Sequence, residues 1–302
     1  MSLLLRLAYD GTDFHGYAKQ NPRPDGTPVR TVQGELEHAL RALYKTDVPT
    51  RAASRTDAGV HAHGQLVAFE PPLDIPPEGL ARGVSGRLPS DVTVLAAWQE
   101  SGAEGWPVDV RADNDGKYYR YRIRCTEGAD PLATRYEWHL GRRLDPVVMQ
   151  EAAARFVGTH DFSSFRASTC QARSTMRTVQ AVEISWGPTA VGPMSDPGRL
   201  DPRVRAGEPE PGPASAWGPD WIEVHVWGTA FLQFMVRIMV GSLVEVGLGR
   251  KPPAWISGLL AAGDRRLAGP TAPPQGLTLV EVLWRREARA EEGAAPEPDE
   301  EQ

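Results

Sequence analysis

The chain has 302 residues, of which 41% are hydrophobic and 24% charged, and its formal net charge is −6. These values are typical of a globular protein with enough chain for one large domain or two ordinary ones. The two cysteines, Cys125 and Cys170, follow no metal-binding or redox spacing, which argues against a disulfide scaffold or a zinc site and fits a reducing compartment.

The N-terminal third reads as a strand, a helix and a strand pair. Apolar residues alternate over residues 2–9, which predicts a strand. After a polar loop, Thr31 suits a helix N-cap, because an apolar stripe at helical spacing follows it. Short strands are predicted at 48–53 and 64–69. The sequence SRTDAGVHAHGQ, residues 54–65, would then lie on a loop between strands, where functional side chains are commonly displayed.

The middle of the chain contains one strongly patterned strand. Residues 92–98 predict a strand, and residues 99–107 read as a linker. Beyond it, KYYRYRIR (117–124) alternates, so that Tyr119 and Tyr121 share one face while the arginines share the other.

The second half mixes helices and strands. The pair Asp145-Pro146 predicts a helix start, with a capping carboxylate followed by a prolyl first turn. A strand pair is predicted at 178–186 and 221–227. The segment between them, 187–220, has 14 Gly or Pro among 34 residues, which predicts a flexible surface insertion.

Two more helices are predicted at 229–246 and 254–262. The first is strongly apolar, but Gln233, Arg237 and Glu245 within it argue against a membrane span. The opening MSLLLRLAYDG is interrupted by charges too early for a signal peptide. We therefore expect a cytoplasmic protein that does not cross a membrane.

The net negative charge comes from the C-terminal end. Residues 287–302 contain seven acidic residues and one arginine, a net charge of −6, so residues 1–286 are close to neutral. This segment is too polar to bury a core, and we expect a disordered acidic tail. A neutral body still permits a basic cleft, because the arrangement of charge matters more than its sum.

The order of elements favours an α+β fold with two α/β subdomains and a mixed, largely antiparallel central sheet flanked by helices. We expect an N-terminal subdomain over 1–100 that carries the Asp57 loop. A C-terminal subdomain over 107–286 would include the insertion.

Asp57 is the first candidate for chemistry. An aspartate in a loop is usually a turn former or a cap. Here Arg55 stands two positions before it, and Gly59 permits a sharp turn two positions after it. An arginine near a carboxylate keeps it ionised, which a nucleophile or general base requires.

Arg237 is the second candidate, within the apolar FLQFMVRIMVGSLVEVG. An arginine at a helix edge can extend to water, whereas a buried one needs a partner because desolvation is costly. We favour pairing with a functional carboxylate, and Asp57 is the best candidate.

The tyrosines and histidines allow more than one interpretation. Tyr119 and Tyr121 could be core residues, or with the neighbouring arginines they could stack single-stranded bases. His61 and His63 raise the hypothesis of a metal hydrolase with Asp57 as a further ligand. No carboxylate-rich third cluster or barrel pattern accompanies them, so metal binding is the less favoured hypothesis.

Taken together, these motifs resemble the tRNA pseudouridine synthase A family. The similarity covers LAYDGTDFHGY, RTVQGELEHAL, SRTDAGVHAHGQ, GVSGRLP, VRADNDGKYYRYRI, HDFSSFRAS, CQAR, FLQFMVRIMVGSLVEVG and GLTLVEV. Their order and approximate spacing match over residues 3–283. The combination of RTDAGVHA with the distant MVR-x-x-VGSL-x-EVG is far more specific than a single short motif.

The resemblance implies a homodimeric isomerase that converts uridine to pseudouridine at positions 38, 39 and 40 of the tRNA anticodon stem-loop, without a cofactor or metal. It implies that Asp57 is the catalytic aspartate, that Tyr119 packs on the target base and that Arg237 pairs with Asp57. Arg55 would help to displace the target nucleotide. We predict substrate contacts from Arg55, Tyr119, Tyr121 and Arg173.

The chain departs from the family pattern at Tyr17, Ala18, Ser54, Ser85 and Asp109. None of these positions is a predicted catalytic residue. The departures at Tyr17, Ala18 and Ser85 leave open an alternative function, that of a diverged tRNA-binding protein without catalysis.

Overall fold

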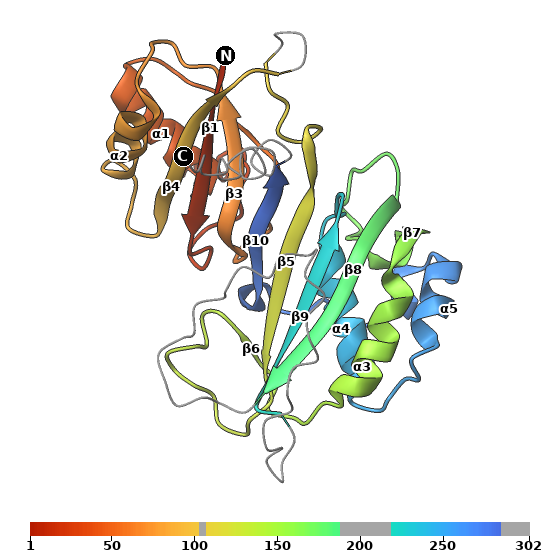
Figure 1. Ribbon diagram of the computed structural model, residues 1–302. Helices are drawn as coiled ribbons and strands as arrows, with labels where there is room; N and C mark the ends of the chain where they lie inside the picture. The colour runs from red at the N-terminus through yellow and green to blue at the C-terminus, as the bar shows by residue number, and fades with distance from the viewer. Residues whose placement is uncertain (103–106, 188–218, 285–302) are drawn as a thin grey trace, which may run out of the picture.

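The computed structural model describes residues 1–102, 107–187 and 219–284 (Figure 1). The predicted acidic tail lies outside these residues, as does almost all of the predicted 187–220 insertion.

The described strands form one mixed, largely antiparallel sheet, as the α+β prediction requires. Their order is β4-β1-β3-β10-β5-β9-β8-β7, with β2 beside β3 and β6 beside β5. The β10–β3 and β5–β6 pairs are parallel and the others antiparallel. The strands are β1 (Ser2–Tyr9), β2 (Arg51–Ala52), β3 (His61–Phe69), β4 (Val92–Glu100), β5 (Asn114–Arg124), β6 (Trp138–His139), β7 (Gly158–Asp161), β8 (Met176–Gly187), β9 (Trp221–Gly228) and β10 (Leu277–Trp284).

Helices lie beside both ends of the sheet (Figure 1). In the N-terminal half, α1 and α2 pack together and α2 contacts β4; in the C-terminal half, α3 contacts α4 and β8. The α-helices are α1 (Val32–Tyr44), α2 (Pro77–Ser85), α3 (Pro146–Ala153), α4 (Met235–Gly247) and α5 (Trp255–Ala262), and the short 3-10 turns are η2 (Ala154–Phe156), η3 (Ser163–Phe165), η4 (Arg265–Leu267) and η5 (Pro274–Gly276).

The last described strand, β10, joins the two halves. It runs parallel to β3 at Thr278 and Leu279, which pair with His61 and Ala62, and antiparallel to β5 on its other side. The last described strand therefore lies in the middle of the sheet, between β3, which follows the Asp57 loop, and β5, which carries Tyr119 (Figure 1). The division into subdomains 1–100 and 107–286 stays a prediction, and the sheet is continuous across it.

Local sequence signals explain two helix starts. The Thr31 hydroxyl accepts from the Gly34 amide at the start of α1, and Asp145 caps α3 by accepting from the amides of Val147 and Val148. Side-chain oxygens at this position satisfy amides that have no partner inside the helix. Both caps were predicted from the sequence.

Two strands begin elsewhere than predicted, and one helix was not predicted. The strand predicted at 48–53 is only Arg51–Ala52, and the strand predicted from residue 64 begins at His61, because β3 pairs with both β1 and β10 there. The hydrophobic pattern did not predict α2, which follows Pro76 and has a second proline, Pro77, as its first residue.

The helix predicted at 229–246 begins only at Met235. Phe234 has φ 65, a left-handed conformation that cannot continue a helix backward, and the preceding residues form a turn after β9. Arg237 therefore lies in the first turn of α4 and not in the helix interior.

Both faces of β1 are covered. In β1, Leu3, Leu4, Leu5 and Leu7 are all fully buried, so the strand packs on both sides. Within the described residues, no helix is both long enough and apolar enough to cross a membrane.

Candidate active site

The loop that carries Asp57 is fixed by its neighbours. Tyr17 N donates to Thr56 O (3.1 Å), and the Thr56 hydroxyl lies 2.7 Å from the buried hydroxyl of Tyr9. Gly59 has φ 76, and a Cβ on it would come within 2.9 Å of Pro274, so this turn requires glycine. The loop therefore presents Asp57 from a defined backbone.

The predicted pairing of Asp57 with Arg237 is present in the structure. Arg237 Nη1 lies 3.5 Å from Asp57 Oδ2, and the two side chains are 11% and 16% exposed. Arg237 Nε donates to Ala272 O (2.7 Å), and its guanidinium lies 4.8 Å from the Phe234 ring centre. The start of α4 thus holds a cation against the β2–β3 loop, 180 residues away in sequence.

Burial changes the acidity of Asp57 in the direction opposite to our expectation. Removal from water raises its pKa from 3.8 to about 6, and the charge and hydrogen bond of Arg237 lower it only in part. Desolvation disfavours the charged carboxylate more than one guanidinium at 3.5 Å favours it. Asp57 is therefore mainly ionised at neutral pH, but it is a much stronger base than an exposed aspartate.

Tyr119 lies close to this pair. Its side chain is 6% exposed, and its ring meets Phe231 edge to face at 5.3 Å between centroids. Burial raises the pKa of its phenol, and the negative charge of Asp57 raises it further. The structure therefore brings together Asp57, Arg237 and Tyr119.

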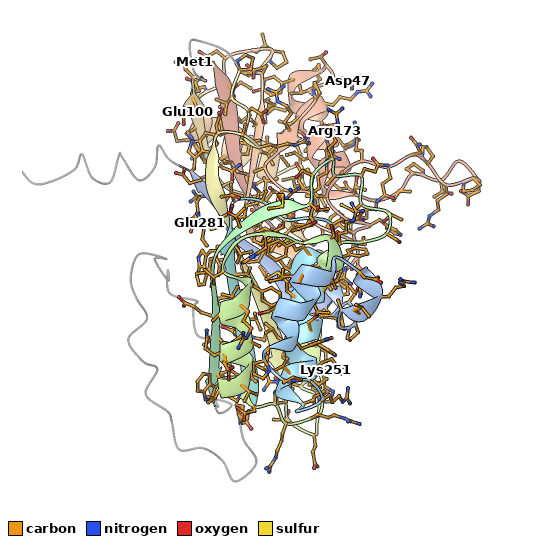
Figure 2. The ribbon with its side chains drawn as sticks, turned by 90° about the vertical axis from the view of Figure 1, so that its right-hand side faces the viewer. Met1, Asp47, Glu100, Arg173, Lys251 and Glu281 are labelled. Atoms are coloured by element: carbon orange, nitrogen blue, oxygen red, sulfur yellow. The ribbon has the colours of Figure 1, made fainter. Side chains whose placement is uncertain are left out.

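Arg55 and Arg173 stand apart from the Asp57–Arg237 pair. Both are exposed: Arg55 directly precedes Thr56, and Arg173 lies on the loop between η3 and β8 (Figure 2). Within the described residues, no hydrogen bond or ion pair joins either arginine to Asp57. Arg237, and not Arg55, is the cation that lowers the pKa of Asp57.

Tyr121 is a core residue in this conformation. It is fully buried, donates its hydroxyl to Pro273 O (2.7 Å) and packs edge to face on Trp138. As the alternation predicts, Arg120 and Arg122 lie on the opposite face of β5, and there both approach Glu223. Tyr119 therefore has no guanidinium from β5 beside its ring.

His61 contributes to local structure. Its Nδ1 accepts from Gly11 N (3.0 Å) and lies 3.2 Å from Asp10, while Tyr136 donates to the other oxygen of Asp10. Burial lowers the pKa of His61. His63 is exposed, and the described residues contain no group of three or more side chains placed to ligate a metal.

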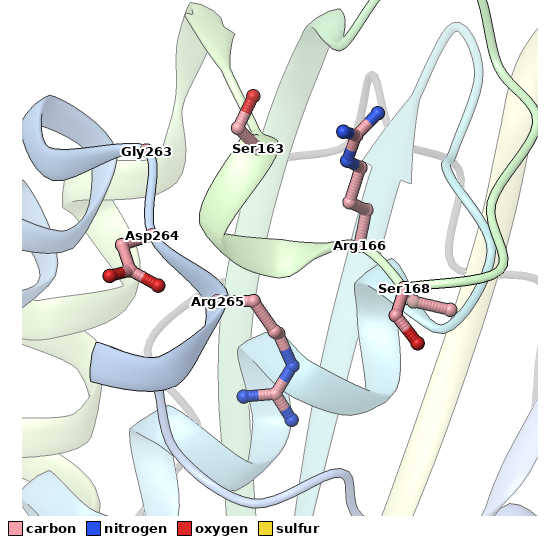
Figure 3. A pocket seen from close by; sticks show the side chains of 7 residues that line it. Ser163, Arg166, Ser168, Gly263, Asp264 and Arg265 are labelled. Carbon is pink, nitrogen blue, oxygen red and sulfur yellow. The ribbon is translucent and has the colours of Figure 1, made fainter.

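A hollow of about 310 Å³ lies between η3 and η4 (Figure 3). Ser163, Arg166, Ser168 and Arg265 are among its lining residues, and no predicted site residue is. The guanidinium groups of Arg166 and Arg265 point in opposite directions, so the hollow offers no convergent charged site.

Sequence reasoning missed three neighbours of Tyr119. Ser54 lies within hydrogen-bond distance of its hydroxyl, and Phe231 packs on its ring. Lys117, on the same face of β5, donates to Thr229 O (3.3 Å) and so holds the turn that carries Phe231. Burial lowers the pKa of Lys117 to about 8. Strand alternation from Tyr119 could have identified Lys117, whereas Phe231 required the tertiary structure.

The mixed sheet of this chain is that of the pseudouridine synthases. A sequence profile of the family described as tRNA pseudouridine synthase matches residues 152–284. The chain is 38% identical to tRNA pseudouridine synthase A of Myxococcus xanthus over 283 residues, which is 94% of this chain and 92% of that protein. It is equally identical to the proteins of that name from Geobacter sulfurreducens (94% of this chain, 99% of that protein) and Geobacillus kaustophilus (93% of each). The chain belongs to the tRNA pseudouridine synthase A family.

Proposed function

We propose that this protein isomerises uridine to pseudouridine in tRNA, at positions 38, 39 and 40 of the anticodon stem-loop. The observation that carries the proposal is the partly buried contact between Asp57 and Arg237, beside Tyr119, in a chain of this family. A carboxylate that is partly desolvated yet paired is suited to attack or proton transfer near neutral pH.

The reaction is balanced without a donor or acceptor. The N1–C1′ bond of uridine breaks, the uracil turns, and a C5–C1′ bond forms. The hydrogen on C5 leaves as a proton, and N1 gains one. Because nothing is oxidised, reduced or transferred to another molecule, we propose that the reaction needs no cofactor and no metal.

Asp57 is the proposed catalytic residue. Its ionised form can add to C6 of the ring or assist departure at C1′, and both routes require the carboxylate. Arg237 lowers the pKa of Asp57 against the opposing effect of burial, so it increases the ionised fraction at a given pH.

The target uridine must leave the stem before it can react. Extruding a base costs a few kcal/mol, and stacking on an aromatic side chain can return roughly 1–3 kcal/mol. We propose that Tyr119 packs on the extruded uracil and that the exposed Arg55 helps to displace the nucleotide. Arg173, also exposed, would contact the RNA backbone, and Tyr121 would contribute to substrate binding by supporting the site from the core.

We propose that the protein acts in the cytoplasm as a homodimer that binds tRNA across both subunits. The family membership supports tRNA as the substrate class, and no observation favours the alternative of a binding protein without catalysis. The metal-hydrolase alternative has little support, because His61 is engaged with Gly11 and Asp10.

A tritium-release assay tests the proposal. tRNA transcripts labelled with tritium at C5 of uridine free the label only when C5 forms the new glycosidic bond. We expect release from transcripts with uridine at positions 38–40, none from transcripts without it, and full activity in chelator. Binding without release would favour the non-catalytic alternative, and activity lost in chelator and restored by a metal would favour the metal enzyme.

A further inference from the structure

Ser54 is the hydrogen-bond partner that the structure shows for the Tyr119 hydroxyl. The two oxygens are 2.8 Å apart, and either can donate. Tyr119 is buried, so this contact and the edge-to-face packing on Phe231 restrict where its ring can lie. A short contact between two hydroxyls in a buried setting is directional.

The position of Ser54 is itself set by Gln65. Gln65 Nε2 donates to Ser54 O (2.7 Å), and Gln65 Oε1 accepts from Ser54 N (3.2 Å). The amide side chain thus pairs with the backbone of Ser54 just as a neighbouring strand would. It continues the β2–β3 pairing one residue beyond the bond from Ala53 N to Leu66 O.

The same amide also connects to the other side of the Asp57 loop. Gln65 is fully buried, and its Nε2 lies 3.4 Å from the Tyr9 hydroxyl, which in turn contacts Thr56. Ser54 and Thr56 are therefore anchored to one buried group on either side of the exposed Arg55. The loop that presents Asp57 and the ring of Tyr119 share one hydrogen-bonded frame.

We propose that Ser54 is a positioning residue for pseudouridine formation. Held by Gln65, its hydroxyl fixes the Tyr119 ring beside the loop that presents Asp57, where the extruded uracil would lie. The inference rests on the proposed function, because Ser54 is expected to act through Tyr119 without touching the substrate. A group that acts in this way should affect turnover more than RNA affinity.

A double-mutant cycle on single-turnover tritium release tests the inference, with Ser54→Ala, Tyr119→Phe and the double variant. We expect each single change to lower the rate on the order of tenfold, because a misplacement near 1 Å can cost about a hundredfold. The double variant should be no slower than the slower single variant, because both changes remove the same bond. Ser54→Thr keeps the hydroxyl and should restore most of the rate.

Two further readouts distinguish positioning from general loss of structure. In Ser54→Ala, tRNA affinity and the acid limb near pH 6 from Asp57 should stay unchanged. Thr159→Ala is the matched control, because it removes another 2.8 Å hydroxyl pair, with Thr178, on the distant edge strand β7. It should leave turnover unchanged.

The inference would be overturned if the two changes acted independently, so that the fold-reduction in rate of the double variant equalled the product of the two single reductions. A fully active Ser54→Ala protein would overturn it as well. A wild-type protein that binds tRNA but frees no tritium would refute the proposed function first, and the positioning role with it.

Discussion

Replacing Asp57 by asparagine should stabilise the fold while it removes activity. Burial raises the pKa of Asp57 from 3.8 to about 6, and its side chain is 16% exposed. Each pKa unit corresponds to about 1.4 kcal/mol, so the charged carboxylate costs the folded state about 3 kcal/mol relative to its neutral form. Asparagine resembles the neutral form and cannot ionise.

The sign of this effect depends on pH. The folded state binds the proton of Asp57 more tightly than the unfolded state, so the favourable contribution of the protonated group is complete below about pH 4. It is lost as pH rises through about 6. The free energy of unfolding of the Asp57→Asn protein should therefore exceed that of the wild type by less than about 1 kcal/mol at pH 4 and by about 3 kcal/mol at pH 8.

Urea unfolding of both proteins between pH 4 and pH 8 measures the difference directly, since the other titrating groups cancel. Asp47→Asn is the control, because Asp47 is 84% exposed, and this surface change should shift the free energy of unfolding by less than about 0.5 kcal/mol. A gain that does not grow with pH, or a destabilised Asp57→Asn protein at pH 8, would refute the argument that burial dominates this site.

Three other predictions concern the same site. Wild-type kcat/KM should fall about tenfold per pH unit below about 6, where Asp57 takes up a proton, as a pH–rate profile would show. Arg237→Met should move this acid limb to higher pH and lower turnover at pH 7, with Arg237→Lys less affected; normal turnover in Arg237→Met would remove the proposed role of the pair. Gly241→Ala should reduce both thermal stability and activity. The new Cβ would lie 1.8 Å from Pro270 O, so it would displace the segment whose Ala272 carbonyl accepts from Arg237. An unchanged melting temperature would contradict this packing.

Much of the fold could be predicted because its signals are local. Alternation located β1 and β5, and side-chain caps located the starts of α1 and α3. The start of α4 could not be predicted from the pattern, because Phe234 adopts its left-handed conformation in a turn that tertiary contacts hold.

The contact between Asp57 and Arg237 could be predicted from the sequence, but the pKa of Asp57 could not. The pattern of a lone arginine in an apolar helix suggested a partner, and Arg237 does contact Asp57. Arg237 does favour the ionised form of Asp57, but burial raises the pKa of Asp57 on balance, and the sequence does not show how deeply a loop is buried. Ser54 appeared in the sequence only as a departure from the family pattern, and its bond to Tyr119 emerged from the structure.

The central claim is that one partly buried carboxylate carries the isomerisation, and the most direct measurement is tritium release from C5-labelled tRNA by the Asp57→Ala protein beside the wild type. We expect the variant to fold and to bind tRNA with nearly wild-type affinity while it releases no tritium. Continued release by that variant would contradict the account.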